Sequence, residues 1–495
     1  MNNSMVSESI AYAFCWVVLL FVGLRFWRKR FHPVAIPYSI EVGFLVKATA
    51  AIGFVCIYNY FLLSNDAFAY LEDSRILHAV FSKSPSDYFK FLFGGNNTET
   101  AIQTFLSETS LWSRGYTNLI NDSQNVIRVN SLIYFVSLGN PYVHALLMGL
   151  ISLLGVHHLT QAFKHKISSR PALFFWGLLL LPNALFWTAG ILKEPFVVLG
   201  LGLFVRGIFS SETSKRNYWY ITIGILLLIG FKPYVLIAML VGLSFYILSQ
   251  LIFATKPFIA LSIWIGFVTL FLLAYPAGRN QLASNITRKQ NDSLKVGKGG
   301  LYVQKDSATF YYFHTAHLHR LTLKDSTAQL NEISTAWVKK INQNDQFKPI
   351  TLHPNGEKWN VYLALDSSKS LISISPINNS FANLLKNSPE ALSNAAFRPF
   401  PTDNSSALKL PSILETTVVF ALLVFACWKR RKLNFQEQRL LIAIVLFAVC
   451  ILLLVGWTTP VNNAIVRYRI PAFMAIFAIS LFVIETPDSW KTKKK

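Results

Sequence analysis

Two aspartates and a tyrosine share one short stretch, residues 65–77, that directly follows a long apolar run. Four side chains in it recur at intervals that place them on one face of a helix: Asp66, Tyr70, Asp73 and Leu77. Glu72 and Arg75 lie on another face, at a spacing that lets them pair. A carboxylate held beside an aromatic ring at a membrane boundary can act as a general base on a lipid-linked substrate. The alternative is an interfacial helix whose acidic side chains only face water.

The composition indicates a membrane protein with many spanning helices. The chain has 495 residues, of which 53% are hydrophobic and 14% charged, and its mean hydropathy is +0.40. Several apolar runs reach the roughly 20 residues that a spanning helix needs. A net charge of +22 would suggest nucleic acid in a soluble protein, but much of it lies in short loops between apolar runs, as positive-inside topology requires. All four cysteines fall inside apolar runs, so we expect neither disulfides nor a metal cluster.

The apolar runs predict an all-α polytopic protein of about eleven spans, with a small α+β domain added. We expect four parts: an additional N-terminal span and loop (1–39), a membrane module (40–275) with a long first loop (64–140), the α+β domain (276–411) and a three-span C-terminal module (412–495). The spans are expected near residues 8–25, 40–63, 142–163, 171–189, 195–206, 218–231, 234–253, 257–275, 412–428, 439–457 and 470–485.

Each of the two long polar regions has its own pattern. In the first loop, one face of a helix over 122–138 is predicted to be apolar, carrying Val126, Val129, Ile133 and Val136, as in helices that lie in the membrane plane. In the domain, 301–303 and 361–365 predict strands, and 325–342 predicts a helix. A His-x-x-His-x-His run that starts at His314 has no nearby carboxylate or cysteine, which argues against a metal site.

The basic clusters in every second loop predict the orientation. They place the N-terminus outside, the C-terminus in the cytoplasm and both long polar regions outside. Five basic residues lie on the outer side against this trend: Lys193, Lys232, Arg398, Arg467 and Arg469. Cations held there favour a phosphate or diphosphate headgroup, which Arg binds with two hydrogen bonds and Lys as a point charge. The alternatives are headgroup snorkelling, or an internal pair such as Lys193 with Glu194.

Two motifs resemble a known family of membrane enzymes. Asp66-Ala-Phe-Ala-Tyr70-Leu71-Glu72-x-x-Arg75 resembles the Asp-x-x-x-Tyr start of the first outer loop in GT-C type glycosyltransferases that use polyprenyl-phosphate sugars. Arg467-Tyr468-Arg469-Ile470-Pro471 resembles the Arg-Tyr-Arg-x-Pro start of a late helix in these proteins. Among them the chain looks most like bacterial relatives of the protein mannosyltransferases and the aminoarabinose transferase. The chain departs from the family by its additional first span and by Ala67, which stands where many members have a glutamate, so the choice between Asp66 and Asp73 stays open.

The resemblance implies a GT-C-like topology and a cell-envelope glycosyltransferase in the cytoplasmic membrane of a bacterium. It implies transfer of a sugar from a polyprenyl-phosphate donor to a glycan, lipid or protein acceptor on the extracytoplasmic face, with membrane lipid as the surroundings and no cofactor or nucleic acid. Asp66 or Asp73 would be the catalytic base. The substrate-binding residues would be Tyr70, Arg75, Lys193, Glu194, Lys232, Arg398, Arg467, Tyr468 and Arg469.

Two other classes of protein fit the same pattern. One is an O-antigen or exopolysaccharide polymerase or ligase that acts on lipid diphosphates, in which Arg and Lys would do most of the work. The other is a non-enzymatic membrane component of glycan export. A transporter should carry ionisable residues deep in its spans, whereas Glu41 and Lys47 are expected near a helix end, which counts against it.

Overall fold

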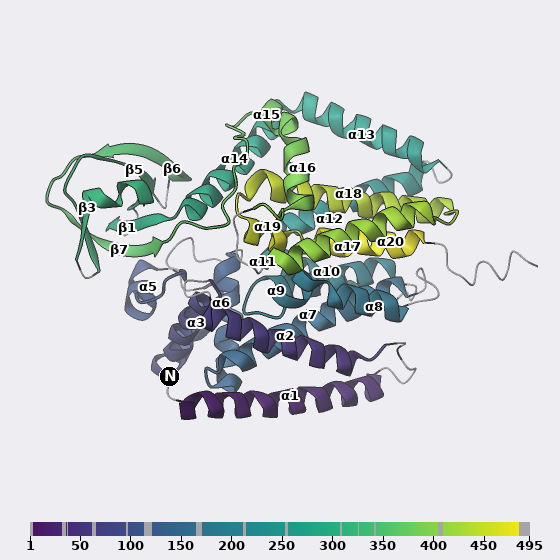
Figure 1. Ribbon diagram of the computed structural model, residues 1–495, viewed down its shortest axis with the longest axis horizontal. Helices are drawn as coiled ribbons and strands as arrows, with labels where there is room; N and C mark the ends of the chain where they lie inside the picture. Colours follow the sequence, from purple (N-terminus) through teal and green to yellow (C-terminus); the bar gives the residue numbers. More distant parts are fainter. Residues whose placement is uncertain are drawn as a thin grey trace, which may run out of the picture. The chain divides into compact units, whose positions relative to one another are not determined.

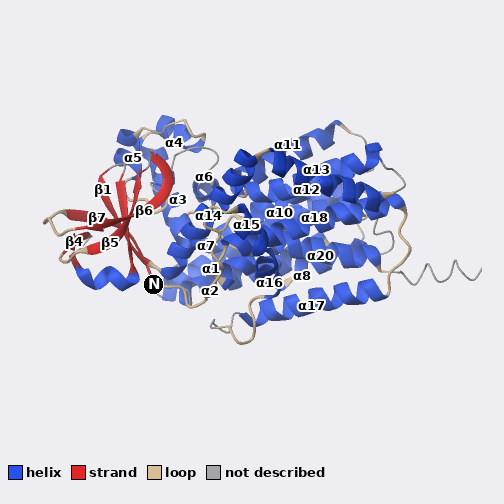
Figure 2. Cartoon of the chain, turned by 90° about the horizontal axis from the view of Figure 1, so that it is seen from above, coloured by secondary structure: helices blue, strands red, loops and turns tan. Residues whose placement is uncertain are grey.

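Helices make up most of the computed structural model, and one antiparallel sheet interrupts them (Figures 1 and 2). The chain divides into two compact units. The first holds Met1–Leu261, Leu414–Ile451 and Ile470–Lys495, and the second holds Ser262–Ile413 and Leu452–Arg469. The structure describes residues 3–31, 36, 38–61, 66–95, 98–112, 121–164, 171–210, 214–252, 256–306, 309–324, 326–340, 343–403 and 409–484.

The first unit is helical throughout the part that the structure describes. Three long helices, α13 (Pro257–Ala274), α17 (Lys409–Trp428) and α18 (Phe435–Thr458), continue across the division between the units. The others in the first unit are α1 (Asn3–Phe31), α2 (Ile40–Tyr60), α3 (Asp66–Lys83), α4 (Pro85–Leu92), α5 (Glu99–Leu106), α6 (Asp122–Ser137), α7 (Pro141–Phe163), α8 (Pro171–Leu180), α9 (Pro182–Trp187), α10 (Glu194–Phe209), α11 (Lys215–Phe231), α12 (Pro233–Ile252) and α20 (Ile470–Val483).

The apolar helices confirm a polytopic membrane protein. Among the described residues seven helices are long and apolar enough to cross a membrane, or eight if α19 (Asn462–Tyr468) and α20 form one span. The fourth predicted span is divided into α8 and α9, because Pro182 cannot continue the hydrogen-bond ladder of α8. With α10 and α11 also shorter than 18 residues, the count stays below the predicted eleven.

Close helix contacts in the first unit depend on glycines. A Cβ at Gly155 of α7 would lie 2.5 Å from the backbone carbonyl of Val198 in α10, and one at Gly202 of α10 would meet the carbonyl of Gly155. Small residues of this kind let spanning helices approach closely without a gap. The packing of α7 on α10 therefore leaves no room for larger side chains at these positions.

We expect Gly155→Ala to lower the midpoint of thermal unfolding in detergent. Forcing a methyl group into a filled contact costs about 1–3 kcal/mol. Gly53→Ala in α2 is the matched control, because a Cβ there has no neighbouring atom within 4 Å and alanine favours a helix by about 0.5–1 kcal/mol. Equal midpoints for the two variants would contradict the tight contact between α7 and α10.

The described residues of the first long polar loop form the four helices α3 to α6. The helix predicted over 122–138 is present as α6. On its predicted apolar face Val126 and Ile133 are buried, and the opposite face also carries a buried side chain, that of Arg128. Val136, also on the predicted apolar face, is exposed. Arg128 donates hydrogen bonds to the carbonyl of Phe91 (3.0 Å) and to Asn125 (2.7 Å), and its guanidinium lies over the ring of Trp112. Phe91 and Trp112 come from other parts of the loop, so the spacing of apolar residues within α6 could not reveal that Arg128 is buried.

The second unit contains a seven-stranded antiparallel sheet with the order β3-β4-β7-β1-β2-β5-β6. Leu301, Tyr311, Phe313 and Trp359 belong to the core on one face of the sheet. The predicted strands at 301–303 and 361–365 are confirmed as parts of β1 and β7. The elements are α14 (Pro276–Lys298), β1 (Gly300–Asp306), β2 (Thr309–His314), β3 (Leu321–Lys324), β4 (Thr327–Leu330), β5 (Ser334–Lys340), β6 (Gln343–Leu352), β7 (Lys358–Leu365), α15 (Phe381–Lys386) and α16 (Ser388–Phe397), and α19 also lies in this unit.

The predicted helix over 325–342 is wrong, because β4 and β5 occupy this segment. Ala328 and Leu330 alternate in burial with Thr327 and Gln329, as the two faces of a strand require. β4 pairs with β3 and β7, and β5 pairs with β2 and β6. Pairing with these neighbours overrides the local preference for a helix.

Candidate functional site

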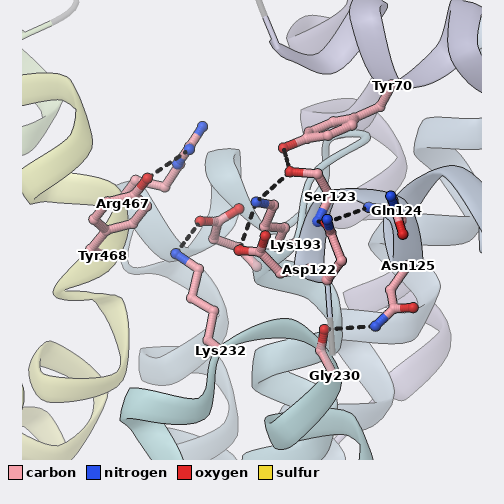
Figure 3. A network of polar contacts seen from close by, with 12 residues as sticks. Tyr70, Asp122, Ser123, Gln124, Asn125, Lys193, Gly230, Lys232, Arg467 and Tyr468 are labelled. Carbon is pink, nitrogen blue, oxygen red and sulfur yellow. Dashed lines mark hydrogen bonds and ion pairs between the residues drawn. The ribbon is translucent and has the colours of Figure 1, made fainter. Parts of the chain in front are cut away.

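Lys193 joins two segments that are far apart in the sequence. It stands at the end of the turn between α9 and α10, and its ammonium lies 2.7 Å from the carboxylate of Asp122 and 3.1 Å from the hydroxyl of Ser123, both in the first turn of α6 (Figure 3). Asn121 caps this helix by accepting hydrogen bonds from the backbone of Ser123 and Gln124. The cap fixes the start of α6 and so the direction in which the side chains of Asp122 and Ser123 project from it.

A second ion pair lies next to the first along the chain. The ammonium of Lys232, at the junction of α11 and α12, is 3.0 Å from the carboxylate of Glu194. The rings of Phe196 and Phe231 stack with their centroids 4.1 Å apart and so hold the two junctions together. The alternative of internal ion pairs is confirmed in kind for both lysines. Lys193 pairs with Asp122 and Lys232 with Glu194, so each of the neighbours Lys193 and Glu194 binds a residue from a different element.

α6 also contacts the end of α11 directly. The side-chain amide of Asn125 donates to the carbonyl of Gly230 at 2.8 Å (Figure 3). Three segments of the first unit therefore meet at one place: the start of α6, the turn before α10 and the end of α11. The structure brings the basic residues of both turns near one another. Their place on the outer side of the membrane stays a prediction.

Tyr70 lies beside this junction. Its hydroxyl is 3.5 Å from that of Ser123, and the ammonium of Lys193 is 5.7 Å from its ring centroid. Burial raises the pKa of Tyr70 above its usual range; Lys193 opposes the rise, while Asp66 and Asp122 add to it. The phenol therefore keeps its proton at neutral pH and can donate a hydrogen bond.

Asp66 is the first residue of α3 and stands one helical turn before Tyr70. Its side chain is half-buried, and its charge acts on the Tyr70 phenol. A carboxylate, a neutral phenol, a hydroxyl and an ammonium are thus gathered around the start of α3 and the start of α6. Such a set can accept a proton and can stabilise a departing anion.

Asp73 has a different environment from Asp66. It is 1% exposed, and its carboxylate accepts hydrogen bonds from the backbone N–H groups of Ser110 (2.8 Å), Leu111 (2.7 Å) and Trp112 (3.2 Å). Burial raises the pKa of Asp73, and these three N–H groups oppose the rise. Asp73 therefore anchors the segment after α5 to α3, and this role favours Asp66 as the base.

We expect Asp73→Asn to weaken the anchor without changing the chemistry. In asparagine one carboxylate oxygen is replaced by an NH₂ group, which cannot accept hydrogen bonds from the backbone N–H groups. Leaving buried donors unsatisfied in this way costs about 1–3 kcal/mol. Amide hydrogen exchange of residues 110–112 should become faster, while turnover of the folded variant stays close to that of the wild type. A large loss of turnover with unchanged exchange would return the role of base to Asp73.

Arg75 points away from this group of residues. It forms the predicted pair with Glu72, at 2.6 Å, and both side chains are more than half exposed. The pairing with Arg75 lowers the pKa of Glu72. The arrangement is that of a solvated helix face, and nothing in it gathers other site residues around Arg75.

Two of the arginines predicted to bind substrate instead form hydrogen bonds and an ion pair with residues of the second unit. Arg469 is 0% exposed and donates to the carbonyls of Ala395, Ala396 and Arg398 at the end of α16. Arg398 pairs with Asp403 at 2.6 Å. Both arginines therefore hold the end of α16 and the loop that follows it.

Arg467 and Tyr468 lie at the end of α19. The guanidinium of Arg467 donates to the hydroxyl of Tyr468 at 3.3 Å and lies over its ring. Both side chains are half-buried. They remain predicted substrate-binding residues.

Asp122 and Ser123 are site residues that the sequence prediction missed. The Asn-Asp-Ser run at 121–123 is a helix N-cap signal directly before α6, and this signal could have placed the two side chains at a helix start. Nothing in the sequence indicates that the turn before α10 reaches them, because Lys193 and Ser123 are 70 residues apart.

Comparisons with family models, with curated proteins and with solved structures found no match to this chain. The described residues contain no group of three or more His, Cys, Asp and Glu side chains that could hold a metal ion. The chemistry of the candidate site is therefore judged from its own side chains.

Proposed function

We propose that the protein is a glycosyltransferase that moves a sugar from a polyprenyl-phosphate donor to an acceptor on the outer face of a bacterial cytoplasmic membrane. One observation carries the proposal: Lys193 meets Ser123, Asp122 and Tyr70 next to the start of α3, where Asp66 stands. The proposal includes eleven spans, with the N-terminus outside and the C-terminus in the cytoplasm.

In the proposed reaction Asp66 accepts the proton of the acceptor hydroxyl. The oxygen then forms a bond to the anomeric carbon, and the bond from that carbon to the phosphate oxygen breaks. The polyprenyl phosphate leaves with the electron pair. Because phosphate is a good leaving group, one carboxylate and a compensating cation suffice for the reaction.

The two lysines have different roles in this proposal. The Lys193–Asp122 pair is accessible from the side of Asp122, whose side chain is 44% exposed, while that of Lys193 is 15% exposed, so a donor phosphate can displace this carboxylate. The Lys232–Glu194 pair is enclosed, with both side chains at most 6% exposed, and it holds the two turns in place. Lys193 is then the cation that meets the phosphate, aided by the hydroxyls of Ser123 and Tyr70.

The test is reconstitution of the full chain in proteoliposomes with polyprenyl-phosphate glucose, mannose or aminoarabinose. The expected result is release of polyprenyl phosphate that depends on an added acceptor and on Asp66. A lipid-diphosphate oligosaccharide serves as the competing substrate. Turnover of that substrate alone, independent of Asp66, would contradict the proposal and favour a polymerase or ligase. Failure to turn over any donor would favour a non-enzymatic role in glycan export.

A further inference from the structure

Lys47 lies in the first half of α2, inside a candidate membrane span, and is 1% exposed. Its ammonium donates three hydrogen bonds: to the carbonyls of Ala184 (3.1 Å) and Leu185 (3.2 Å), and to the hydroxyl of Thr188 (2.6 Å). An ammonium has three N–H donors, so these three contacts use all of them. All three acceptors belong to the last turn of α9 or to the residue that ends it.

The other end of α9 meets a buried carboxylate. The backbone N–H of Asn183, near the start of the helix, donates to Glu415 of α17, and Glu415 is 2% exposed. A helix carries a partial positive charge at its N-terminal end and a partial negative charge at its C-terminal end. α9 therefore lies between two buried side chains whose charges match its dipole.

These contacts replace the water that is missing inside a membrane. The first N–H and the last C=O groups of a helix have no partner within the helix, and in an apolar medium each unsatisfied group is costly. α9 has only six residues, so its last four carbonyls, most of the helix, have no partner within it; the carbonyl of Phe186 accepts from the backbone N–H of Ala189 in the turn that follows. Lys47 supplies a partner for two of them at the end that leads to the turn.

The turn after α9 is also fixed against α2. Gly190 packs so closely on the ring of Phe54 that a Cβ there would clash with it. The ring of Phe54 in turn lies 5.2 Å from that of Phe186 in α9. Within the turn, the N–H of Leu192 donates to the carbonyl of Gly190 at 2.8 Å. α2 thus contacts both α9, through Phe186, and the turn that follows it, through Gly190. This turn ends at Lys193.

We propose that Lys47 is a positioning residue for Lys193. By binding the end of α9 it fixes the turn over 188–193 and so places the ammonium of Lys193 beside Asp122 and Ser123, while Glu415 holds the start of α9. The positioning role of Lys47 is inferred from these contacts alone. An effect of Lys47 on turnover rests in addition on the proposed function.

The test is amide hydrogen exchange of residues 188–193 in the full chain, compared between wild type and Lys47→Met. We expect exchange there to become at least about tenfold faster, because the variant loses the contacts that keep this segment closed. Lys47→Arg keeps the charge and should restore most of the protection. Leu153→Ala, at a fully buried position of α7, is the control for general destabilisation and should leave this segment unchanged relative to the other helices.

Thr188→Val keeps the test valid if Lys47→Met does not fold, because it leaves Lys47 and its two carbonyl acceptors in place and removes only the Thr188 hydroxyl, which accepts from Lys47 and donates to the carbonyl of Ala184. It should speed exchange of 188–193 by about threefold. Unchanged protection of this segment in Thr188→Val and in any folded Lys47→Met protein would overturn the proposal. So would equal acceleration in Leu153→Ala, because Lys47 would then act only on overall stability.

A second measurement separates the positioning from the proposed function. Binding of farnesyl phosphate to the protein in nanodiscs should weaken by about tenfold in Lys47→Met, the usual cost of losing one well-placed charged contact. Faster exchange together with unchanged binding would leave the positioning intact and contradict the contact of Lys193 with a donor phosphate. No binding by the wild type would contradict the proposed function alone.

Discussion

Replacing Asp66 with asparagine should lower turnover about 10²–10⁴-fold, the usual contribution of a positioned general base. Asparagine keeps the size and the hydrogen-bonding capacity of the side chain but cannot take the proton of an acceptor hydroxyl. Affinity for the donor should change little, because a lone carboxylate does not attract a phosphate. The measurement is the rate of polyprenyl phosphate release in proteoliposomes at saturating donor.

Glu72→Gln is the matched control for this substitution. It also neutralises a carboxylate on α3, but Glu72 is exposed and pairs with Arg75 on the other face. Its turnover should stay near that of the wild type. A folded Asp66→Asn protein that turns over as fast as Glu72→Gln would remove Asp66 from the chemistry. With Asp73 engaged by backbone N–H groups, the polymerase or ligase would then be the better explanation.

Lys232→Met should have the largest effect on stability among the site variants. It leaves the carboxylate of Glu194 buried without the ammonium that now lies 3.0 Å away. Breaking a buried pair by removing one partner typically costs about 3–5 kcal/mol, because the remaining charge stays away from water. The measurement is the midpoint of thermal unfolding in detergent, together with the yield of folded protein.

The double variant Lys232→Met, Glu194→Gln should regain most of this loss, since it removes the stranded charge. Arg75→Ala breaks the exposed pair with Glu72 and should cost at most about 1 kcal/mol, as surface pairs do. A double variant as unstable as Lys232→Met would show that the pair itself, and not the stranded charge, determines the stability.

Hydrophobicity predicted the positions of the long helices well. α2, α7, α12, α13, α17 and α18 match predicted spans. A long apolar segment can be recognised from its own residues, without knowledge of the other parts of the chain that it contacts. The helix predicted over 325–342 failed for the opposite reason. β4 and β5 are stabilised by hydrogen bonds to strands elsewhere in the chain, and these partners cannot be identified from the local sequence.

Only some members of the candidate site could be predicted from the sequence; Asp122, Ser123 and the pairings could not. The motif around Asp66 and the unusual lysines singled out Tyr70, Lys193 and Lys232, which the structure places in one unit near one junction. Their partners were not predictable. Residues next to each other, such as Lys193 and Glu194, leave a helix start in different directions and meet different elements.

Lys47 also has a consequence for how the protein is made. A lysine inside a spanning helix opposes insertion, by about 2.5–3.5 kcal/mol at the centre of the helix and by less at the position of Lys47 in its first half. The first carbonyl that compensates it belongs to Ala184, 137 residues further along the chain. At typical synthesis rates that residue emerges on the order of ten seconds later. During this interval α2 carries an uncompensated charge, so we expect it to wait beside the insertion machinery, and to enter the lipid only together with α9.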